Sequence, residues 1–414
     1  MKVAVIGAGP AGLFVASQLK YSEVTVFEAN SKPGVKLNIT GKGRCNLTNA
    51  CSVEEFMENV VTNPRFLYSA LRSFTPTDTV EFFEKNGLRL VTERGRRVFP
   101  ASNKASDVTA TLVNLCKHNN TEFVYSQVKS VAKNQDESFN VTDSLGEIRN
   151  FDKLILCTGG ISYPETGSDG SGYLLAKQLG HSITGPYPAL VPIETNEDVS
   201  SLAFLDLKNV RVKVVDGKRT YEDFGDAEFF KKGLCGPTVL SLSSKINKSE
   251  LSQLEIYLDL KPALTEETLE NRLLREFAKK ENKTVLDVAK TLLPTKMIAY
   301  YLSFCSVSGD KRTDRVTKED RKNLIRGLKA MRFTVKRLSD VSRGIVTSGG
   351  VNVKEINPSD MQSKMVKGLY FAGEIIDVDA LTGGYNIQIA LSTARLVAEH
   401  INKVEKEKIN GYSD

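Results

Sequence analysis

Three glycines near the start of the chain have the spacing of a dinucleotide-binding turn. Gly7, Gly9 and Gly12 follow an apolar β-branched run and open a helix-compatible segment. In such a unit the first glycine permits the tight turn, the second lets the backbone approach a pyrophosphate, and the third lets the helix pack against the sheet. The N–H groups at the helix N-terminus would face the diphosphate. Glu28 ends the next apolar strand, where it can accept hydrogen bonds from ribose hydroxyls.

Residues 34–49 favour FAD over a nicotinamide nucleotide as the ligand. A nicotinamide-binding unit normally continues straight to its next helix and strand. Here the chain reads GVKLNITGKGRCNLTN, a glycine-rich stretch with basic residues. We expect it to wrap a longer ligand that runs from the ribose toward a flavin. An ordinary polar loop with scattered glycines is the alternative.

Two later segments strengthen the flavin interpretation. Residues 123–151 have the pattern of a β-meander, with a first strand over 123–131, and a buried strand follows and ends in Thr158-Gly159-Gly160. Residues 368–374 repeat that pattern of an apolar strand followed by glycine and an acid.

A predicted helix after Gly383-Gly384 faces the same region. It begins at Tyr385-Asn386 and is expected to end near Asn402, ahead of a charged, frayed tail. The positive end of its dipole would face an electron-rich group, such as the N1–O2 edge of a reduced flavin. A Gly-Gly loop before a packing helix is the alternative.

These segments resemble the bacterial BaiN/RdsA-like family of NAD(P)/FAD-dependent oxidoreductases, a group of three-domain flavoproteins. The matching stretches are VIGAGPAGL, KLNITGKGRCNLTN, GRRVFPAS, TGGISYPETGSDGSGY, TSGGVNVKEINPSDMQSK and GLYFAGEIIDVDALTGGYNIQIALSTA. The resemblance implies FAD bound without a covalent link. The residues that match its cofactor motifs are Gly7, Gly9, Pro10, Ala11, Glu28, Lys36, Thr40, Gly41, Arg44, Cys45, Val128, Thr158, Gly159, Gly373, Glu374, Asn386 and Ile387, and the glycine turns add Gly12 and Gly384.

One segment departs from the family pattern. Where the family usually shows Phe-Thr-His-x-Gly-x-Ser-Gly-Pro, residues 229–237 read FFKKGLCGP. No role of that histidine can therefore be transferred to this chain.

Cofactor motifs at both ends of the chain indicate one nucleotide-binding domain with an insertion. We expect an α/β fold, a Rossmann-like FAD-binding domain with a parallel sheet and a β-meander, interrupted by a β-barrel-like domain that carries a helical subdomain. Within the insertion, Val210, Val212 and Val214 alternate as in a strand, Asp216-Gly217 marks a hairpin, and Thr265 begins a helical stretch. The expected boundaries are 1–190 and 344–414 for the FAD-binding domain, 191–261 and 331–343 for the β domain, and 262–330 for the helical subdomain.

Composition narrows the setting of the protein. The six cysteines form no CxxC pair, which suits a reducing cytoplasm. The apolar N-terminal run contains two glycines and Pro10, which argues against a secretory signal. No apolar stretch is long enough to predict a transmembrane helix. With His118, His181 and His400 as the only histidines, no metal site is expected, and His181 is interpreted as structural.

A basic stretch lies inside the insertion. Residues 310–343 hold twelve Lys or Arg against five acids, a net charge of +7. Clustering of this kind is typical of phosphate-rich nucleic acid as a partner, with Arg312, Arg315, Lys318 and Lys322 as candidate contacts. A solvated helix face is the alternative.

The flavin would carry the redox chemistry, and the protein would orient the substrate and supply a proton. Candidates for the substrate side are Tyr163, Asp379 and Tyr385, which lie in the glycine-rich loops near the expected flavin ring. The resemblance implies hydride transfer to an activated C=C bond, of a uridine in ribosomal RNA or of a steroid-like enone. No second GxGxxG domain follows, so NAD(P)H as electron donor would visit the flavin transiently.

Other readings of the chemistry stay open. A flavin amine oxidase acting on a small aminoketone, with oxygen as acceptor, gives the basic stretch no role. A disulfide reductase would use Cys45 and Cys51, but five residues separate them instead of four. A non-enzymatic RNA-binding flavoprotein is the third alternative.

Overall fold

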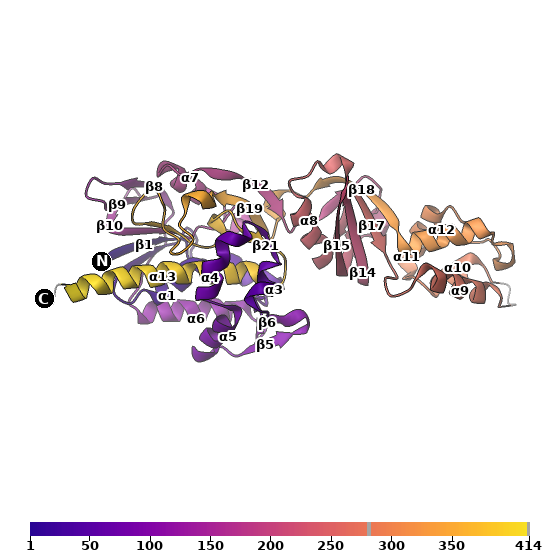
Figure 1. The fold of residues 1–414 in the computed structure, drawn as a ribbon, viewed down its shortest axis with the longest axis horizontal. Coiled ribbons are helices and arrows are strands. Elements are labelled where there is room, and N and C mark those ends of the chain that lie inside the picture. Colours follow the sequence, from indigo (N-terminus) through magenta and orange to yellow (C-terminus); the bar gives the residue numbers. More distant parts are fainter. Residues whose placement is uncertain (280–282, 412–414) are drawn as a thin grey trace. The chain divides into compact units, whose positions relative to one another are not determined.

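The computed structural model describes residues 1–279 and 283–411, which form two compact units. Unit 1 comprises Met1–Ala189 and Val341–Asp414, and unit 2 comprises Leu190–Asp340. Figure 1 shows the elements of both.

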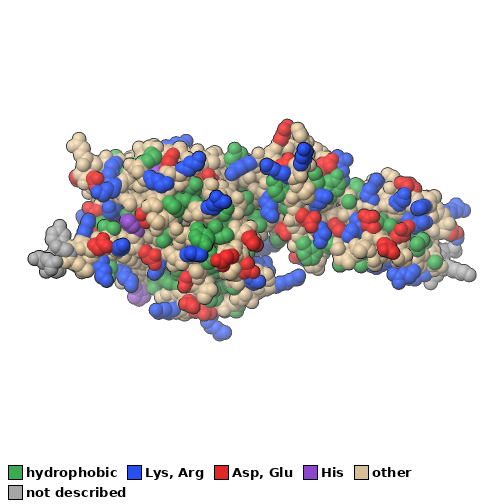
Figure 2. All heavy atoms as spheres, in the orientation of Figure 1, with side chains coloured by type: hydrophobic (Ala, Val, Ile, Leu, Met, Phe, Trp, Pro, Cys, Tyr) green, Lys and Arg blue, Asp and Glu red, His purple; other side chains and the backbone are tan. Residues whose placement is uncertain are grey.

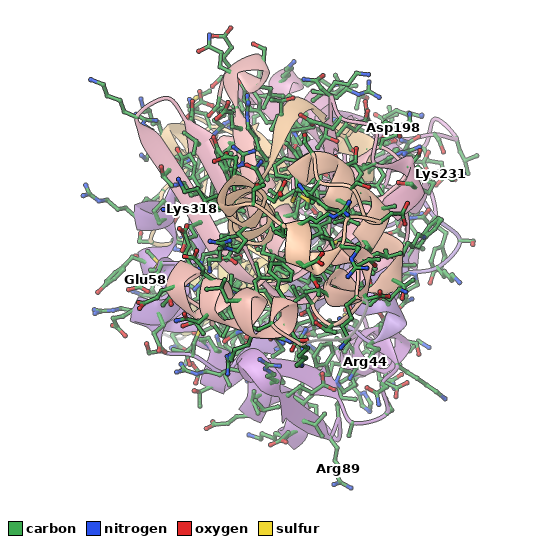
Figure 3. The ribbon with its side chains drawn as sticks, turned by 90° about the vertical axis from the view of Figure 1, so that its right-hand side faces the viewer. Arg44, Glu58, Arg89, Asp198, Lys231 and Lys318 are labelled. Carbon is green, nitrogen blue, oxygen red and sulfur yellow. The ribbon has the colours of Figure 1, made fainter. Side chains whose placement is uncertain are left out.

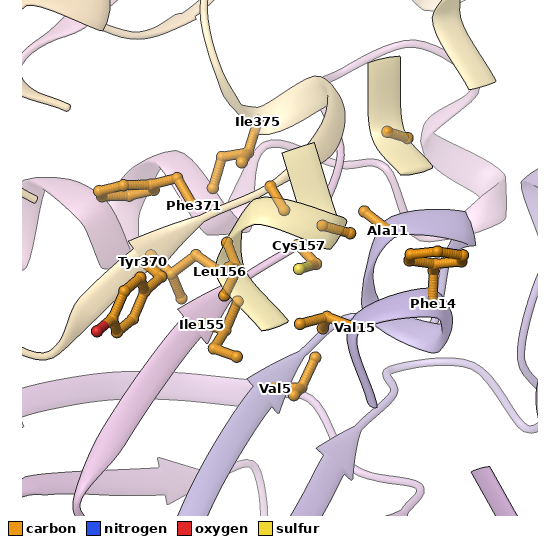
Figure 4. Packing of buried hydrophobic residues seen from close by; sticks show 14 of the residues in the cluster. Val5, Ala11, Phe14, Val15, Ile155, Leu156, Cys157, Tyr370, Phe371 and Ile375 are labelled. Carbon is orange, nitrogen blue, oxygen red and sulfur yellow. The ribbon is translucent and has the colours of Figure 1, made fainter. Parts of the chain in front are cut away.

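The core of unit 1 is a five-stranded parallel sheet with the order β20-β11-β1-β2-β7. Its strands are β1 (Lys2–Ile6), β2 (Glu23–Phe27), β7 (Glu122–Val124), β11 (Lys153–Leu156) and β20 (Leu369–Phe371). Strands buried on both faces read as continuous apolar runs, as β1 and β11 do. Figure 4 shows their side chains packed with Phe14 and Val15 of the first helix.

Helices cover this sheet. The helix α1 (Pro10–Gln18) packs against α6 (Ala105–His118) and against the C-terminal α13 (Tyr385–Gly411), which runs beside it in Figure 1. The helix α13 extends beyond the predicted end at Asn402. The amide of Asn402 donates to the Gln18 carbonyl at 2.8 Å, and Glu405 accepts from the Met1 ammonium at 3.3 Å. These contacts hold the segment that composition alone predicted as frayed.

The predicted meander is present, but its first strand differs from the expectation. Residues 123–131 divide between β7 of the parallel sheet and β8 (Val128–Lys133), which pairs with β9 (Phe139–Asp143) and β10 (Ile148–Phe151). The break follows from a turn in which Ser126 N donates to the Val124 carbonyl at 3.0 Å.

Residues 34–49, expected to wrap the ligand, include a short helix, so they are more regular than the alternative of an ordinary polar loop. They begin with α2 (Val35–Gly43), in which Gly41 and Lys42 adopt left-handed backbone angles that break the helix. The remaining elements of unit 1 are β3 (Thr48–Asn49), α3 (Val53–Met57), β4 (Val60–Thr62), α4 (Tyr68–Ser73), α5 (Pro76–Lys85), β5 (Leu90–Glu93), β6 (Arg97–Pro100), α7 (Ser171–Gln178), β12 (Ile183–Ala189), β19 (Val346–Val351) and β21 (Asp379–Ala380).

Unit 2 is a closed six-stranded barrel with attached helices, in the order β13-β16-β15-β14-β17-β18. Its strands are β13 (Ile193–Thr195), β14 (Leu205–Asp216), β15 (Arg219–Phe230), β16 (Gly233–Cys235), β17 (Glu255–Asp259) and β18 (Met331–Leu338). Its helices are α8 (Pro237–Ile246), α9 (Glu266–Phe277), α10 (Val285–Lys290), α11 (Thr295–Cys305) and α12 (Lys318–Lys329).

The expected fold class is confirmed, since a Rossmann-type sheet is interrupted by an antiparallel barrel with helices. Asp216 pairs with Arg219 across the predicted hairpin turn, and Val210, Val212 and Val214 are buried in the barrel. The Thr265 hydroxyl accepts from Thr268 N and so caps α9 at its predicted start. Within the described residues, no helix has the length and apolar character needed to cross a bilayer.

Candidate functional site

The glycine turn of unit 1 has the geometry that each glycine predicts. Gly7 has a φ of +103°, and a Cβ there would lie 2.6 Å from the Cys157 carbonyl oxygen. A Cβ on Gly12 would lie 1.9 Å from the Gly7 oxygen, so helix and turn touch at this point. A Cβ on Gly9 would meet no atom within 4 Å. Open space therefore lies in front of the N-terminus of α1, where Pro10 and Ala11 follow and the first N–H groups have no intrahelical acceptor.

Glu28 closes one side of this turn. Its Oε2 accepts from Ala8 N at 2.9 Å. Its Oε1 accepts from the backbone N–H of Asn30 at 2.8 Å and from the side-chain Nδ2 of Asn30 at 2.6 Å. An ionised carboxylate offers about four acceptor sites. Glu28 thus supports the turn and retains acceptor capacity for a ribose hydroxyl.

The carboxyl ends of three parallel strands meet beside the turn. Gly7 follows β1, Thr158 and Gly159 follow β11, and Gly373 follows β20. A Cβ on Gly7 would lie 3.1 Å from the Thr158 Cα, and one on Gly373 would lie 2.9 Å from the Ala11 Cβ. The structure therefore brings together segments that stand far apart in the sequence. Ligands of open α/β sheets bind at this edge.

An ion pair between Lys36 and Glu374 joins α2 to the end of β20. The Lys36 ammonium lies 2.8 Å from Glu374 Oε2 and donates to Ser162 Oγ at 2.6 Å. Glu374 Oε1 also accepts from Ser162 Oγ and Thr347 N, both at 2.9 Å. The family resemblance implied Lys36 and Glu374 as cofactor residues but did not imply that they bind each other.

The start of α13 is locked to residues 44–50. A Cβ on Gly384 would lie 2.4 Å from the Thr48 carbonyl oxygen, so only glycine fits there. Asn49 Nδ2 donates to the Gly383 carbonyl at 3.1 Å. Asn386 binds the Ala380 backbone through both its Oδ1 and its Nδ2, at 3.0 Å and 2.8 Å. The neighbouring Ile387 is partly buried against the core.

Gln388 is a structural residue that the sequence did not single out. It is fully buried, and its Oε1 accepts from Thr48 Oγ1 at 2.6 Å and Thr79 Oγ1 at 2.8 Å. Its Nε2 donates to the Phe74 carbonyl at 3.0 Å. The sequence shows only a glutamine between Ile387 and Ile389 in the first turn of a predicted helix.

The other predicted cofactor residues have mainly local roles. Thr40 Oγ1 donates to the Leu37 carbonyl, Gly41 breaks α2, and Val128 begins the meander strand β8. Arg44 binds Glu93 and lies 4.3 Å over the Phe99 ring. This contact holds the pKa of Glu93 below its usual value.

Cys45 is unsuited to thiol chemistry. Its side chain is completely buried, and burial raises the pKa of its thiol to about 12. Cys51 is also reduced, and burial raises the pKa of its thiol as well. Thiols of this kind are poor nucleophiles, which argues against the disulfide reductase alternative.

The three candidates for the substrate side have different surroundings. Asp379 is fully buried in β21. The Tyr385 ring packs edge-on against Phe56 at 4.9 Å, and burial raises the pKa of its hydroxyl to about 12. Tyr163 has a φ of +52° and is partly exposed, with its backbone N–H donating to the Ser342 carbonyl.

His181 has the structural role expected of it. Its Nδ1 lies 3.0 Å from Glu355 Oε2 and its Nε2 lies 2.9 Å from Ser363 Oγ. Its ring also packs edge-on against Phe371. In the part of the chain that the structure describes, no cluster of His, Cys, Asp or Glu could hold a metal ion.

The predicted nucleic-acid contacts lie on the helical part of unit 2. Lys318 and Lys322 are exposed one turn apart on α12, and Arg315 precedes them. Lys318 and Lys322 form no ion pair with a residue among 1–279 and 283–411. Arg312 pairs with Asp314 at 3.1 Å, and Arg315 also acts on the Asp314 carboxyl, whose pKa is lowered. Figure 3 labels Lys318, and Figure 2 shows Lys and Arg side chains over α12 with acids among them. We call Arg315, Lys318, Lys322 and Arg326 the α12 basic face.

The cradle of unit 1 fits FAD. The space in front of Gly9 is where a pyrophosphate would lie, and Glu28 stands where a ribose would follow. Gly373 lies beside Ala11 at the start of α1. The start of α13 is a further segment that the resemblance assigns to FAD.

Comparison with known proteins agrees with this assignment. The profile of a family described as "HI0933-like protein Rossmann domain" matches residues 1–400. A ribosomal RNA dihydrouridine synthase of Haemophilus influenzae is 31% identical, over 96% of this chain and 98% of that protein. A 3-dehydro-bile acid delta(4,6)-reductase of Clostridium scindens is 27% identical, over 95% and 97% of the two chains.

A solved structure shows a related fold. The 3-ketosteroid delta1-dehydrogenase of Sterolibacterium denitrificans has a TM-score of 0.53 and 12% identity, covering 97% of this chain and 99% of that one. At that identity the likeness concerns the fold alone.

Proposed function

The chain belongs to the HI0933-like Rossmann family, which confirms its resemblance to the BaiN/RdsA-like flavoproteins. We propose that it reduces a uridine in RNA to dihydrouridine. Membership makes the chain an FAD-dependent oxidoreductase. The observation that favours RNA over a small substrate is the α12 basic face, in which Lys318 and Lys322 are exposed and form no ion pair within the described residues.

The two relatives' names suggest one type of reaction. One makes dihydrouridine and the other reduces a bile acid at delta(4,6) positions. The C5=C6 bond of uracil is conjugated to a carbonyl group, as is the double bond of an enone. Such a bond accepts a hydride at the carbon remote from the carbonyl, C6 of uracil, and a proton at C5.

The residues of unit 1 would hold the cofactor and bias its electronics. FAD, when bound, supplies hydride from its reduced isoalloxazine. The N-terminus of α1 binds the diphosphate through backbone N–H groups, and Glu28 accepts from the ribose. The N-terminus of α13 directs the positive end of its dipole at the site, with its first turn fixed by Asn386.

Tyr163 is the best placed of the three candidates to donate the proton. Tyr385 is packed against Phe56, and Asp379 is buried inside the small sheet with β4. Tyr163 is the most accessible, and its hydroxyl makes no hydrogen bond to a described residue. Its left-handed backbone is held in place by the hydrogen bond from its N–H to the Ser342 carbonyl.

NAD(P)H is proposed as the electron donor. The described residues contain one Rossmann-type sheet, and the FAD cradle occupies its carboxyl edge. The donor would therefore visit the flavin and leave before the RNA enters, which gives ping-pong kinetics. A small enone or an aminoketone as substrate would leave the α12 basic face without a role.

The decisive test uses the purified yellow protein under anaerobic conditions. NADPH or NADH should bleach the flavin, and unmodified ribosomal RNA transcripts should restore its colour with formation of dihydrouridine, detected by mass spectrometry of the nucleosides. Enones are offered in parallel, and aminoketones in air. Reoxidation by an enone or an aminoketone alone, with no dihydrouridine from any transcript, would contradict the proposal.

A further inference from the structure

We propose that the outer face of the barrel carries a second RNA-binding site, a pocket for one unpaired nucleotide remote from the glycine turn in sequence. This inference rests on the proposed function in taking RNA as the ligand. The pocket has a volume of about 250 Å³ and is lined by Arg211, Lys213, Glu222, Tyr257, Asp259, Lys329 and Ala330. Pockets that enclose drug-sized ligands measure roughly 300–1,000 Å³. The size therefore suits a single base.

Strand register assembles the pocket from residues that are distant in sequence. Tyr257 on β17 pairs with Lys213 on β14 and with Arg332 on β18, so a cation stands on each side of the ring. On its other side, Lys213 lies opposite Glu222 of β15 in the strand register. Side chains directly opposite on neighbouring strands lie within contact distance. The Lys213 ammonium is 5.9 Å from the centre of the Tyr257 ring.

A second row continues the surface beside the first. In the strand register, Arg211 lies opposite Asp259 of β17 on one side and opposite Phe224 of β15 on the other. The Phe224 side chain is exposed. Each of the two rows therefore sets an aromatic ring next to a cation, Tyr257 beside Lys213 and Phe224 beside Arg211. Proteins that bind single-stranded nucleic acid combine stacking rings with a positively charged track.

The charges leave one cation available. Arg211 pairs with Glu222 at 3.3 Å, Lys329 with Asp259 at 2.6 Å, and Arg332 with Glu255 at 2.6 Å. Lys213 has no ion pair within the described part of the chain. We infer that Lys213 binds a phosphate, that the Tyr257 ring stacks on the base, and that the paired acids and cations face the hydrogen-bonding edge of the base.

Helix α12 carries both a residue of the pocket and cations of the α12 basic face. Lys329 lies in the last turn of α12, where it also donates to the Lys261 and Leu264 carbonyls at 3.0 Å and 2.8 Å. Lys318 and Lys322 lie on the same helix. An RNA strand whose phosphates follow α12 would reach the pocket at the C-terminal end of this helix.

The test measures binding of a short fluorescein-labelled oligouridine to the FAD-loaded full chain by anisotropy. Tyr257→Ala should weaken binding roughly 5- to 150-fold, the range measured for loss of one stacked base. Tyr257→Phe keeps the ring and should bind within about 2-fold of the unaltered chain, since stacking uses the ring face. Tyr21→Ala removes a tyrosine of unit 1 that is 43% exposed, and serves as the matched control.

Photocrosslinking keeps the proposal testable if Tyr257→Ala fails to fold. An oligouridine carrying 4-thiouridine should crosslink the unaltered chain to peptides of β14 or β17, and Lys213→Ala should weaken binding. Crosslinks confined to other segments, or unchanged binding by both alanine variants, would overturn the pocket. Uridine monophosphate that blocks crosslinking as well as the oligonucleotide would overturn the assignment to RNA.

The two proposals can fail separately. A crosslink at β17 without any dihydrouridine would contradict the reaction and leave the pocket in place. Dihydrouridine formed by Tyr257→Ala with an unchanged KM for RNA would contradict the pocket and leave the reaction in place.

Discussion

The Lys36 ammonium lies 2.8 Å from Oε2 and 3.1 Å from Oε1 of Glu374, although the two residues are 338 positions apart in the sequence. Both side chains are 22% exposed, so the pair is shielded from bulk water on most sides. The pair fastens the early α2 segment to the late strand β20, and with it two walls of the FAD cradle.

Lys36→Met should therefore destabilise the apo-protein and weaken FAD binding together. Loss of one partner leaves the Glu374 carboxylate with only Ser162 and Thr347 as donors, and we expect a loss of about 1–3 kcal/mol in the free energy of unfolding. Urea unfolding and flavin fluorescence measure the two effects. The exposed Lys32→Met is the control, and an equal effect of both variants would contradict the role of the pair.

Gly9→Ala and Gly12→Ala should separate cofactor binding from folding. A Cβ on Gly9 meets nothing within 4 Å at a φ of −79°, so Gly9→Ala should fold normally. That Cβ would occupy the space of the diphosphate, and the Kd for FAD should rise about tenfold or more, which corresponds to at least about 1.4 kcal/mol.

Gly12→Ala should behave in the opposite way. Its Cβ would lie 1.9 Å from the Gly7 oxygen, and overpacking of this kind destabilises proteins by about 1–3 kcal/mol or more. Thermal unfolding of the two apo-proteins gives the comparison. Unaltered FAD affinity in the Gly9→Ala variant would indicate that the diphosphate does not bind in front of Gly9.

Tyr163→Phe should slow reoxidation of the flavin by RNA by about 10²- to 10⁴-fold, the usual contribution of a general acid. Reduction of the flavin by NADPH needs no such proton and should keep its rate. Rapid-mixing absorbance resolves the two half-reactions. Tyr385→Phe is the comparison, since the Tyr385 ring packs against Phe56, and a larger effect there than at Tyr163 would reverse the assignment.

Charge reversal on the α12 basic face should weaken RNA binding in a salt-dependent way. Lys318→Glu with Lys322→Glu removes two candidate phosphate contacts, and the slope of log K against log salt should fall by roughly 0.7–0.9 per lost contact. Lys85→Glu with Lys117→Glu, both exposed in unit 1, gives the same change in net charge elsewhere. Equal losses in the two double variants would indicate a general charge effect.

His181 should make stability depend on pH near neutrality. Burial holds the pKa of its imidazole below the usual 6.5, against the opposing effect of Glu355. As the pH falls through about 6.5, the unfolded chain therefore takes up a proton before the folded chain does, and the free energy of unfolding decreases until the folded pKa is passed. Urea unfolding from about pH 8 to about pH 5 measures this slope, and His181→Gln should flatten it. An identical slope in that variant would assign the dependence to other groups.

The parts of the site that lie within one stretch of sequence could be predicted. The contacts between distant stretches could not, because they depend on the order and register of the strands. Gly7, Gly12 and Glu28 were predictable because each meets a steric or hydrogen-bonding need within one strand–turn–helix unit. The partners of Lys36 and Gln388 were not, because they come from segments that only the parallel sheet order brings together.

The proposed pocket around Tyr257 could not be predicted from the sequence for the same reason. Tyr257 and Lys213 are 44 positions apart in the sequence, and neither stands in a basic or aromatic run. Antiparallel pairing of β14 with β17 places them side by side. Helix periodicity, in contrast, made the cations of α12 visible from the sequence.

The discontinuous parallel sheet has a consequence for the order in which the chain folds during its synthesis. Strand β20 joins β11 only after residues 190–340, which form unit 2, have left the ribosome. The barrel is contiguous and can fold while the first half of the sheet still lacks its last strand and α13. FAD can thus be captured only late in translation, and a released chain truncated before Gly373 should remain colourless although its barrel can fold.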